Sequence, residues 1–285
     1  MRTIPYDPSR SALYHPAIAP TVLKPGAIHS EALLCAEAAR LAYKRFESSA
    51  DAVRDIETAL GYADFDQVEF FDQQGIQAFA AASAARATTL VAFRGTTRAL
   101  DDVLTDFKTW PKNWCSGGKV HAGFCDAFEQ HRAQLGSWLA AHPGKCLITG
   151  HSLGGALAAL AASVFKPARL ITYGAPRVGD SAFSASLEGV AAVRYVNCCD
   201  FIPRVPPEIL GYRHGGALLY IDHTGRIHRD PGKELMNEDN RQGRREYRQF
   251  ALQPDTIKLR QLADHAPINY TYPIQACDGA LEQSI

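Results

Sequence analysis

The sequence of 285 residues lacks the features that mark several large classes of protein. Its 30 basic and 30 acidic residues balance, and they form no long run of one sign. This balance argues against a nucleic-acid partner, or an anionic membrane, that is held by bulk charge. No apolar stretch reaches the length that is needed to cross a bilayer, so no transmembrane segment is expected. No internal repeat is visible.

Cysteine occurs, but in no pattern that marks a metal site. The seven cysteines are an odd number scattered along the chain, and no C-x-x-C pair suggests zinc. The N-terminus, from Met1 to Pro8, is broken by proline and lacks the apolar core of a signal peptide. We therefore expect reduced cysteines in a cytoplasmic protein. Export by a route that needs no N-terminal signal is the alternative.

A boundary between domains is also missing, because no linker rich in proline, glycine or serine splits the chain. With 46% hydrophobic residues, the chain can bury a large core. We expect an irregular segment over residues 1–29, which contain five prolines, and one domain over residues 30–285.

What the sequence does contain is an alternation of strand and helix patterns. This alternation predicts an α/β fold, in which a sheet is covered by helices on both faces. Residues 223–254 mix both charges with little periodicity, and we interpret them as a solvated excursion. The expected helices cover about residues 30–46, 122–140, 152–165, 180–188 and 255–264, and the expected strands cover 67–72, 76–82, 90–93, 145–149, 169–173, 192–196 and 217–221.

The most informative motif is a serine between glycines, at the point where a predicted strand turns into a predicted helix. It reads Gly150-His151-Ser152-Leu153-Gly154. This layout is typical of a nucleophile elbow, which holds a weakly nucleophilic hydroxyl clear of the sheet, within reach of a base and a carbonyl carbon. Glycine is expected at both flanks because side chains there would collide with neighbouring backbone. The alternative is a glycine-rich turn without chemistry.

A nucleophilic serine needs a carboxylate to orient its base, and elbow folds place that carboxylate after the serine. Asp200 lies just past the carboxyl end of the predicted strand 192–196, and the carboxyl edge of an open sheet is where ligands bind. The alternative for Asp200 is a loop carboxylate that pairs with Arg204. Asp180 also follows a strand, but its position before a predicted helix favours an N-cap.

The base should be a histidine that comes later in the chain than the acid. His265 closes the last predicted helix and lies in a late loop, so it is the favoured base. His214, just before a predicted strand, is the second candidate. His223 and His228 lie in the polar excursion with no obvious anchor.

The negative charge that develops on a substrate carbonyl needs donors aimed at it. The backbone N–H of Leu153, directly after the serine, is one candidate donor. Thr96, in the loop after the strand 90–93, is the other, with its N–H and its hydroxyl. The alternative for residues 93–96 is an ordinary strand end.

Several segments, in the same order along the chain, resemble the class 3, fungal-type lipase family. The resemblance implies an α/β-hydrolase fold, with a central, mostly parallel sheet, and ester hydrolysis without a metal or an organic cofactor. It places the triad at Ser152, Asp200 and His265 and the oxyanion donors at Thr96 and Leu153. The matching segments are 93–96 (FRGT), 120–124 (VHAGF), 150–155 (GHSLGG), 172–179 (TYGAPRVG), 196–200 (VNCCD) with 203–207, 212–214 (YRH) and 264–265 (DH).

The resemblance also implies a lid near residues 97–112, a short amphipathic helix that covers the site and opens at a lipid surface. The apolar residues there have helical spacing, which supports the idea. The alternative is a fixed helix that packs this stripe on the core. The candidate lid and acyl-chain contacts are Leu100, Val103, Leu104, Phe107 and Trp110.

These observations predict a serine carboxylic-ester hydrolase, and first of all a lipase that acts on acylglycerols. The expected partner is a small-molecule or aggregated lipid ester, with transient contact to a lipid surface. The alternatives are an esterase for soluble short-chain or feruloyl esters, and a phospholipase. A catalytically inactive hydrolase scaffold that binds a lipid or a partner protein is a more distant alternative.

Overall fold

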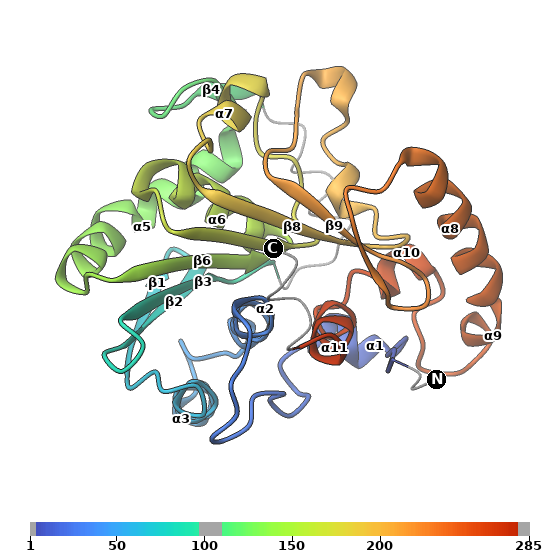
Figure 1. The fold of residues 1–285 in the computed structure, drawn as a ribbon, viewed down its shortest axis with the longest axis horizontal. Helices are drawn as coiled ribbons and strands as arrows, with labels where there is room; N and C mark the ends of the chain where they lie inside the picture. The colour runs from blue at the N-terminus through green and yellow to red at the C-terminus, as the bar shows by residue number, and fades with distance from the viewer. Residues whose placement is uncertain (1–3, 97–109, 279–285) are drawn as a thin grey trace.

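A computed structural model describes residues 4–96 and 110–278 (Figure 1). The main sheet of these residues has eight strands in the order β1-β2-β3-β6-β7-β8-β9-β10. The five strands from β3 to β9 run parallel to their neighbours, and antiparallel strands flank them at both edges. The strands are β1 (Gln67–Gln73), β2 (Ile76–Ser83), β3 (Thr88–Phe93), β6 (Lys145–His151), β7 (Arg169–Tyr173), β8 (Ala191–Asn197), β9 (Ala217–Ile221) and β10 (Ile227–Arg229), and β4 (Pro111–Asn113) pairs with β5 (Lys119–His121) in a separate ribbon.

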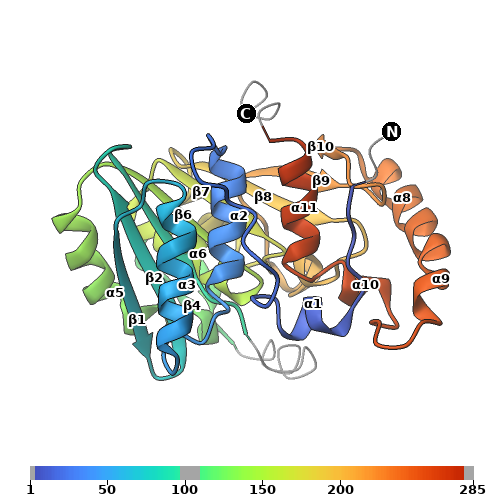
Figure 2. The same cartoon turned by 90° about the horizontal axis from the view of Figure 1, so that it is seen from below.

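Helices cover both faces of this sheet, as the alternating pattern predicted. One face packs against α2, α3 and α11, which lie in front of the sheet in Figure 2. The other face packs against α5 and α6. The helices are α1 (Arg10–Tyr14), α2 (Glu31–Leu41), α3 (Ala50–Gly61), α5 (Ala122–Ala141), α6 (Leu153–Phe165), α7 (Ser181–Ala185), α8 (Lys233–Glu246), α9 (Arg248–Ala251), α10 (Arg260–Ala263) and α11 (Ile268–Ala276), with short 3-10 turns at Ile202–Arg204 and Glu208–Leu210.

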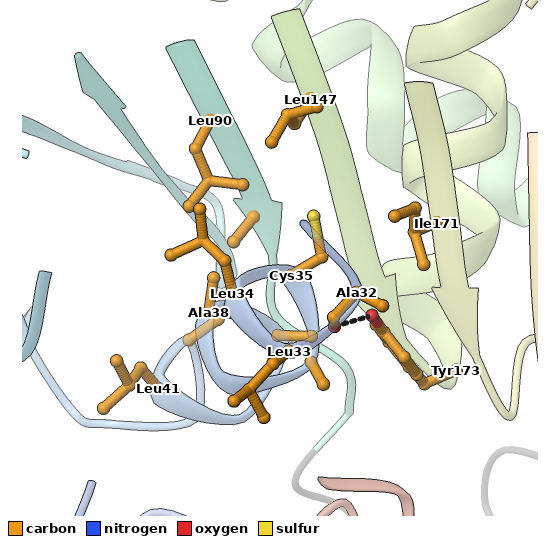
Figure 3. Packing of buried hydrophobic residues seen from close by; sticks show 14 of the residues in the cluster. Ala32, Leu33, Leu34, Cys35, Ala38, Leu41, Leu90, Leu147, Ile171 and Tyr173 are labelled. Carbon is orange, nitrogen blue, oxygen red and sulfur yellow. Dashed lines mark hydrogen bonds between the residues drawn. The ribbon is translucent and has the colours of Figure 1, made fainter. Parts of the chain in front are cut away.

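Helix α2 is held against the sheet by an N-cap, by apolar contacts and by one hydrogen bond from β7. The side chain of Ser30 caps the helix by accepting a bond from the Leu33 N–H at 3.2 Å. Leu34 and Cys35 then face the sheet, against residues such as Leu147 (Figure 3). The phenol of Tyr173 on β7 ties the first turn down by donating to the Ala32 carbonyl at 2.6 Å. The helix ends at Leu41, earlier than expected.

The expectation of a solvated excursion over residues 223–254 is correct about exposure, because few of these residues are buried, but it missed their regular structure. These residues form β10, α8 and α9. The buried face of α8 consists of Asp239, Asn240 and Gly243, so it carries no apolar stripe that a periodicity search could find. Hydrogen bonds attach it instead: Tyr220 on β9 donates to Asp239, and Asn240 donates to the Cys198 carbonyl at 3.0 Å. No helix within the described ranges is long and apolar enough to span a membrane.

Candidate active site

Ser152 occupies the sharp turn between β6 and α6, where the sequence predicted it. Its backbone has φ of 57° and ψ of −129°, a conformation that side-chain-bearing residues rarely adopt. The glycines make this turn sterically possible. A Cβ on Gly150 would lie 2.3 Å from the Gly154 carbonyl, and a Cβ on Gly154 would lie 2.2 Å from the Phe93 carbonyl oxygen. Both collisions involve backbone, which has little freedom to yield.

The three residues of the predicted triad come together in space. His265 Nε2 lies 2.9 Å from Ser152 Oγ, and His265 Nδ1 lies 2.8 Å from Asp200 Oδ2. Asp200 follows β8, and His265 lies between α10 and α11, so both reach the carboxyl edge of the sheet. All three side chains are buried among the described residues. Such a chain from hydroxyl to imidazole to carboxylate can activate a serine as a nucleophile.

Two further donors hold the Asp200 carboxylate. The Tyr270 hydroxyl donates to Oδ2 at 2.6 Å, and the Ile202 N–H donates to Oδ1 at 2.9 Å. Burial, and then the charge of Asp200, raise the pKa of Tyr270 well above its usual value, so the phenol keeps the proton that it donates. With His265 Nδ1–H also donating to this carboxylate, Nε2 is left to accept the proton of Ser152. Tyr270 was missed because a tyrosine inside a buried helix has no distinguishing sequence signal.

Gly174 is a second residue that the sequence reasoning missed. It follows β7 with φ of +57°, and a Cβ there would lie 2.8 Å from Asp200 Oδ2 and 3.2 Å from His265 Nδ1. Only glycine therefore lets the chain pass behind the bond between acid and base. A glycine directly after a strand that leads to the site edge was the available signal.

His151, next to the serine, connects the elbow to the loop of the base. Its Nε2–H donates to the His265 carbonyl at 2.8 Å, and its Nδ1 accepts from the Tyr43 hydroxyl at 2.8 Å. Burial, and then His265, lower the pKa of His151 well below 6.5, so the ring is neutral. Both ring nitrogens are therefore bonded: Nε2 holds the backbone of His265, and the bond from Tyr43 to Nδ1 holds the ring of His151 itself. A lone histidine in the sequence gave no sign of this role.

The two predicted oxyanion donors lie at the same edge of the sheet. Leu153 is the first residue of α6, where backbone N–H groups have no partner within the helix. Thr96 ends the described segment after β3, and its neighbour Gly95 is pressed against the elbow. A Cβ on Gly95 would lie 2.7 Å from the His151 carbonyl oxygen and closer still to the Tyr43 hydroxyl. The donor roles of Leu153 and Thr96 stay predictions.

Comparison with known proteins shows which proteins this chain resembles. Residues 90–210 match the family model described as Lipase (class 3). Over this part of its length the chain is similar to class 3 lipases, in line with the resemblance seen in the sequence. The α/β-hydrolase fold predicted from the sequence is confirmed by solved lipases with the same architecture.

Three relatives show the extent of the likeness. The secreted mono- and diacylglycerol lipase 1 of Fusarium solani is 35% identical over 161 residues, which are 52% of this chain and 48% of the relative. A lipase of Rhizopus niveus is 35% identical over 153 residues, which are 47% of this chain and 38% of the relative. The solved triacylglyceride lipase of Rhizomucor miehei has a TM-score of 0.56 and 26% identity, covering 67% of this chain and 77% of that one. The chain thus spans about half, or less, of the length of these two curated relatives.

The cytoplasmic location expected from the sequence is wrong. The Fusarium solani relative is named as secreted, as is a lipase of Malassezia restricta that is 31% identical. The expectation rested on an N-terminus without the apolar core of a signal peptide, and it included reduced cysteines; all seven cysteines are unpaired in the structure. However, burial raises the pKa of the Cys35 and Cys146 thiols. Buried thiols of this kind are unreactive, so they do not indicate a reducing compartment.

The other candidates for acid and base have different partners. Asp180 caps α7 by accepting from the Phe183 N–H at 2.9 Å, as the N-cap interpretation predicted. Arg204 donates to Asn240 rather than to Asp200. His214 Nε2–H donates to the Pro203 carbonyl, and burial, followed by the charge of Arg194, lowers its pKa to about 3.

The two histidines that seemed to lack an anchor are bound to carboxylates. His223 pairs with Asp239, and His228 pairs with Asp222 at 2.7 Å. Asp222, His223 and Asp239 are also close enough together to hold a metal ion, as are Cys198, Cys199 and Asp264. In both groups the carboxylate oxygens already accept hydrogen bonds, and Arg260 brings positive charge beside Asp264. The expectation of no metal stays a prediction.

Most of the candidate lid lies outside the described residues, including Leu100, Val103, Leu104 and Phe107. Trp110 is described and stands directly before β4, with 87% of its surface exposed. A large exposed aromatic ring is available to contact a ligand or a surface. Its role as an acyl-chain contact stays a prediction.

Proposed function

We propose that this protein hydrolyses carboxylic esters, and acylglycerols first of all, through an acyl-enzyme on Ser152. The observation that carries the proposal is the buried chain of two hydrogen bonds, at 2.9 and 2.8 Å, that joins Ser152 to His265 and His265 to Asp200. The strained backbone of Ser152 supports it, because strain of this kind persists at functional sites. The names of the relatives, lipases for mono-, di- and triacylglycerols, favour this substrate class.

In the first half of the proposed reaction, Ser152 Oγ attacks the ester carbonyl carbon while its proton passes to His265 Nε2. Asp200 holds the imidazole in orientation and stabilises its positive charge. The N–H of Leu153 and the groups of Thr96 donate to the carbonyl oxygen as it becomes negative. The tetrahedral intermediate then collapses, the C–O bond to the alcohol breaks, and His265 Nε2–H gives its proton to the departing alcohol.

In the second half, water attacks the acyl-enzyme carbonyl and loses its proton to His265 Nε2. A second tetrahedral intermediate forms at the same donors. Its collapse releases the carboxylic acid and returns the proton to Ser152 Oγ. Every step uses side chains and backbone of this chain, and we propose that no metal or organic cofactor takes part.

Replacement of the serine is the primary test. Ser152→Ala should lower kcat on an acylglycerol by about 10³-fold or more, because a serine-protease triad loses nearly all its activity with its nucleophile. The same change should prevent labelling by a fluorophosphonate. Ser137→Ala, on the exposed side of α5, is the matched control and should behave like wild type. Normal turnover by folded Ser152→Ala would contradict the proposal.

The substrate class is tested with a panel of esters of increasing chain length, each below and above its solubility limit. A rise in rate when an acylglycerol aggregates would support contact with a lipid surface through the segment 97–112. Equal rates on dissolved short-chain or feruloyl esters would favour an esterase instead. Preference for a diacyl phospholipid would favour a phospholipase.

A further inference from the structure

Asp264 directly precedes the base, and its buried carboxylate makes three hydrogen bonds. Oδ2 accepts from the Cys199 N–H at 2.9 Å and from Arg260 Nε at 3.1 Å. Oδ1 accepts from the Tyr6 hydroxyl at 2.8 Å. Asp264 is completely buried, although it takes no part in the proposed reaction. Burial of a charge is costly unless it is paired and fully bonded, so a carboxylate in this position requires an explanation.

These bonds join the loop of the acid to the loop of the base. Cys199 immediately precedes Asp200, and Asp264 immediately precedes His265. The bond from the Cys199 N–H to Asp264 therefore ties the two loops together one residue away from the Asp200–His265 bond. A second tie runs parallel to it, because Asn197 Nδ2 donates to the Asp264 carbonyl at 3.1 Å. Together they limit how far the acid and the base can separate.

Arg260 supplies the charge that lets the carboxylate remain buried, and other parts of the fold hold Arg260 in place. Its guanidinium donates to the Gly243 carbonyl at 2.8 Å and to the His223 carbonyl at 3.3 Å. It also lies over the ring of Tyr6, 5.4 Å from the ring centroid. The pair thus connects α8 and the loop after β9 to the base.

Tyr6 brings the N-terminal segment into the same cluster. The next residue, Asp7, exchanges two backbone bonds of 2.8 Å with the Asn269 side chain, and the Ile257 N–H donates to the Pro8 carbonyl at 2.8 Å. The segment is therefore attached on both sides of residue 264. Its contacts with the cluster can be altered without changing any residue that touches substrate.

We propose that Asp264, balanced by Arg260 and completed by Tyr6, is a positioning residue that holds His265 at bonding distance from Asp200. The inference rests on the proposed function, since the spacing of acid and base matters only for a working triad. A merely structural ion pair would contribute to stability and would leave kcat of each correctly folded molecule unchanged. A positioning pair would change kcat with little change in KM, because it does not touch substrate.

The test compares two isosteric variants in one background. Arg260→Met removes the positive charge, so that neither variant leaves an uncompensated buried cation. In that background, Asp264→Leu removes the acceptor for the Cys199 N–H, and Asp264→Asn restores one. We measure kcat and KM on a soluble ester, well below each melting temperature, with active sites counted by fluorophosphonate titration. We expect the leucine variant to lose about 10- to 100-fold in kcat, as for a small misplacement of a catalytic group, while the asparagine variant recovers most of it.

The buried pair of Glu37 and Arg40 on α2 provides the control. These side chains are also fully buried and paired, with bonds of 2.9 and 2.6 Å. Glu37→Leu with Arg40→Met should lower the melting temperature without changing kcat per titrated site. Equal kcat in the Asp264→Leu variant and in this control would overturn the proposal.

A readout that does not depend on activity separates the two claims. The downfield proton resonance of His265 Nδ1–H should shift or broaden in the Asp264→Leu variant and stay in place in the Glu37 control. If wild type hydrolyses no ester but the resonance moves, the proposed function fails, while the effect of Asp264 on the His265–Asp200 bond stands. If wild type is active and both kcat and the resonance are unchanged, the positioning role fails.

If the double variants do not fold, Tyr6→Phe is a milder substitution that still tests whether Asp264 positions His265. It removes the bond to Asp264 Oδ1 and keeps the ring beneath Arg260. We expect about a 2- to 5-fold loss of kcat, within the range of a single hydrogen bond, at unchanged KM. Unchanged kcat together with an unchanged His265 resonance would contradict the proposal here too.

Discussion

The helices α6 and α8 both contribute to the structure around the site, but the sheet holds them by opposite means. Leu157 and Leu160 of α6 are completely buried in the apolar layer on one face of the sheet. The buried face of α8 is polar, and Asp239 and Asn240 attach it to Tyr220 on β9 and to the Cys198 carbonyl.

The difference has a physical consequence. Apolar contact is not directional, so α6 depends on close packing and on room for its backbone. Hydrogen bonds are directional, so α8 depends on a few specific partners that must all be present. Ser152 is placed by the first mechanism, and Arg260 is supported by the second through the Gly243 carbonyl.

The largest effect is expected from crowding the backbone of α6 at the elbow. Gly154→Ala would push a Cβ against the Phe93 carbonyl, which cannot move without distorting β3. We expect kcat on an acylglycerol to fall by about 10²-fold or more, through misplacement of Ser152. Gly61→Ala at the end of α3, where a Cβ meets nothing within 4 Å, is the control and should leave kcat unchanged. Similar kcat values for the two variants would contradict the account of the elbow.

The next largest difference is expected between alanine substitutions of one leucine in α6 and one in α8, compared by their free energies of unfolding in chemical denaturation. Leu160→Ala in α6 should lower the free energy of unfolding by about 2–5 kcal/mol, because it leaves a cavity in a packed layer. Leu235→Ala in α8, where 44% of the residue is exposed, should cost about 0.5 kcal/mol or less. Comparable losses would mean that α8 is also held by apolar packing.

The polar attachment of α8 is tested at Asn240. Asn240→Ala removes donors to the Cys198 carbonyl and to the Tyr220 hydroxyl, at 3.0 and 2.9 Å. We expect the free energy of unfolding to fall by about 1–3 kcal/mol, the cost of leaving buried polar groups without partners. Arg241→Ala, at an exposed position one residue further along α8, is the control. Equal stabilities of the two variants would show that these bonds contribute little.

A smaller difference is expected in how acid affects stability through His151, which precedes α6, and through Asp239 on α8. The pKa of His151 is depressed by burial and then by His265, so its contribution to stability is complete above about pH 6.5 and is lost as the pH falls below that value. Burial alone would raise the pKa of Asp239, but bonds from Tyr220 and His223 lower it, so its contribution persists until about pH 4.

The measurement is the free energy of unfolding between pH 6.5 and 4.5. His151→Gln should reduce its dependence on pH by up to about 1.4 kcal/mol per pH unit, which corresponds to one proton. Asp239→Asn should lower stability but leave the slope in this range close to that of wild type. An unchanged slope in His151→Gln would mean that the imidazole is not held neutral.

Sequence reasoning succeeded where the chemistry is local. The turn at Ser152 needs glycine at both sides, and this requirement is visible within five residues. The helix that begins near residue 30 and the apolar strands were equally visible, because a helix or strand pattern repeats within one element. The helices within residues 223–254 were missed because the face of α8 that packs is polar.

The choice among four late histidines depended on chain order, and only the fold shows why His265 suits the role. It alone among them lies within hydrogen-bond distance of both Ser152 and Asp200 in the structure of residues 4–96 and 110–278. Chain order is a family regularity, whereas these distances are a property of the folded molecule.

The residues that chemistry requires, a serine in a glycine-flanked turn followed by an acid and a histidine, could be identified along the chain alone. The residues that hold the acid and the base in place could not be identified in this way. Tyr270, His151 and Asp264 act through bonds to residues that lie 65 or more positions away in the sequence. No local pattern encodes such bonds, because a hydrogen bond depends on the direction and separation of two groups, and folding alone brings them together.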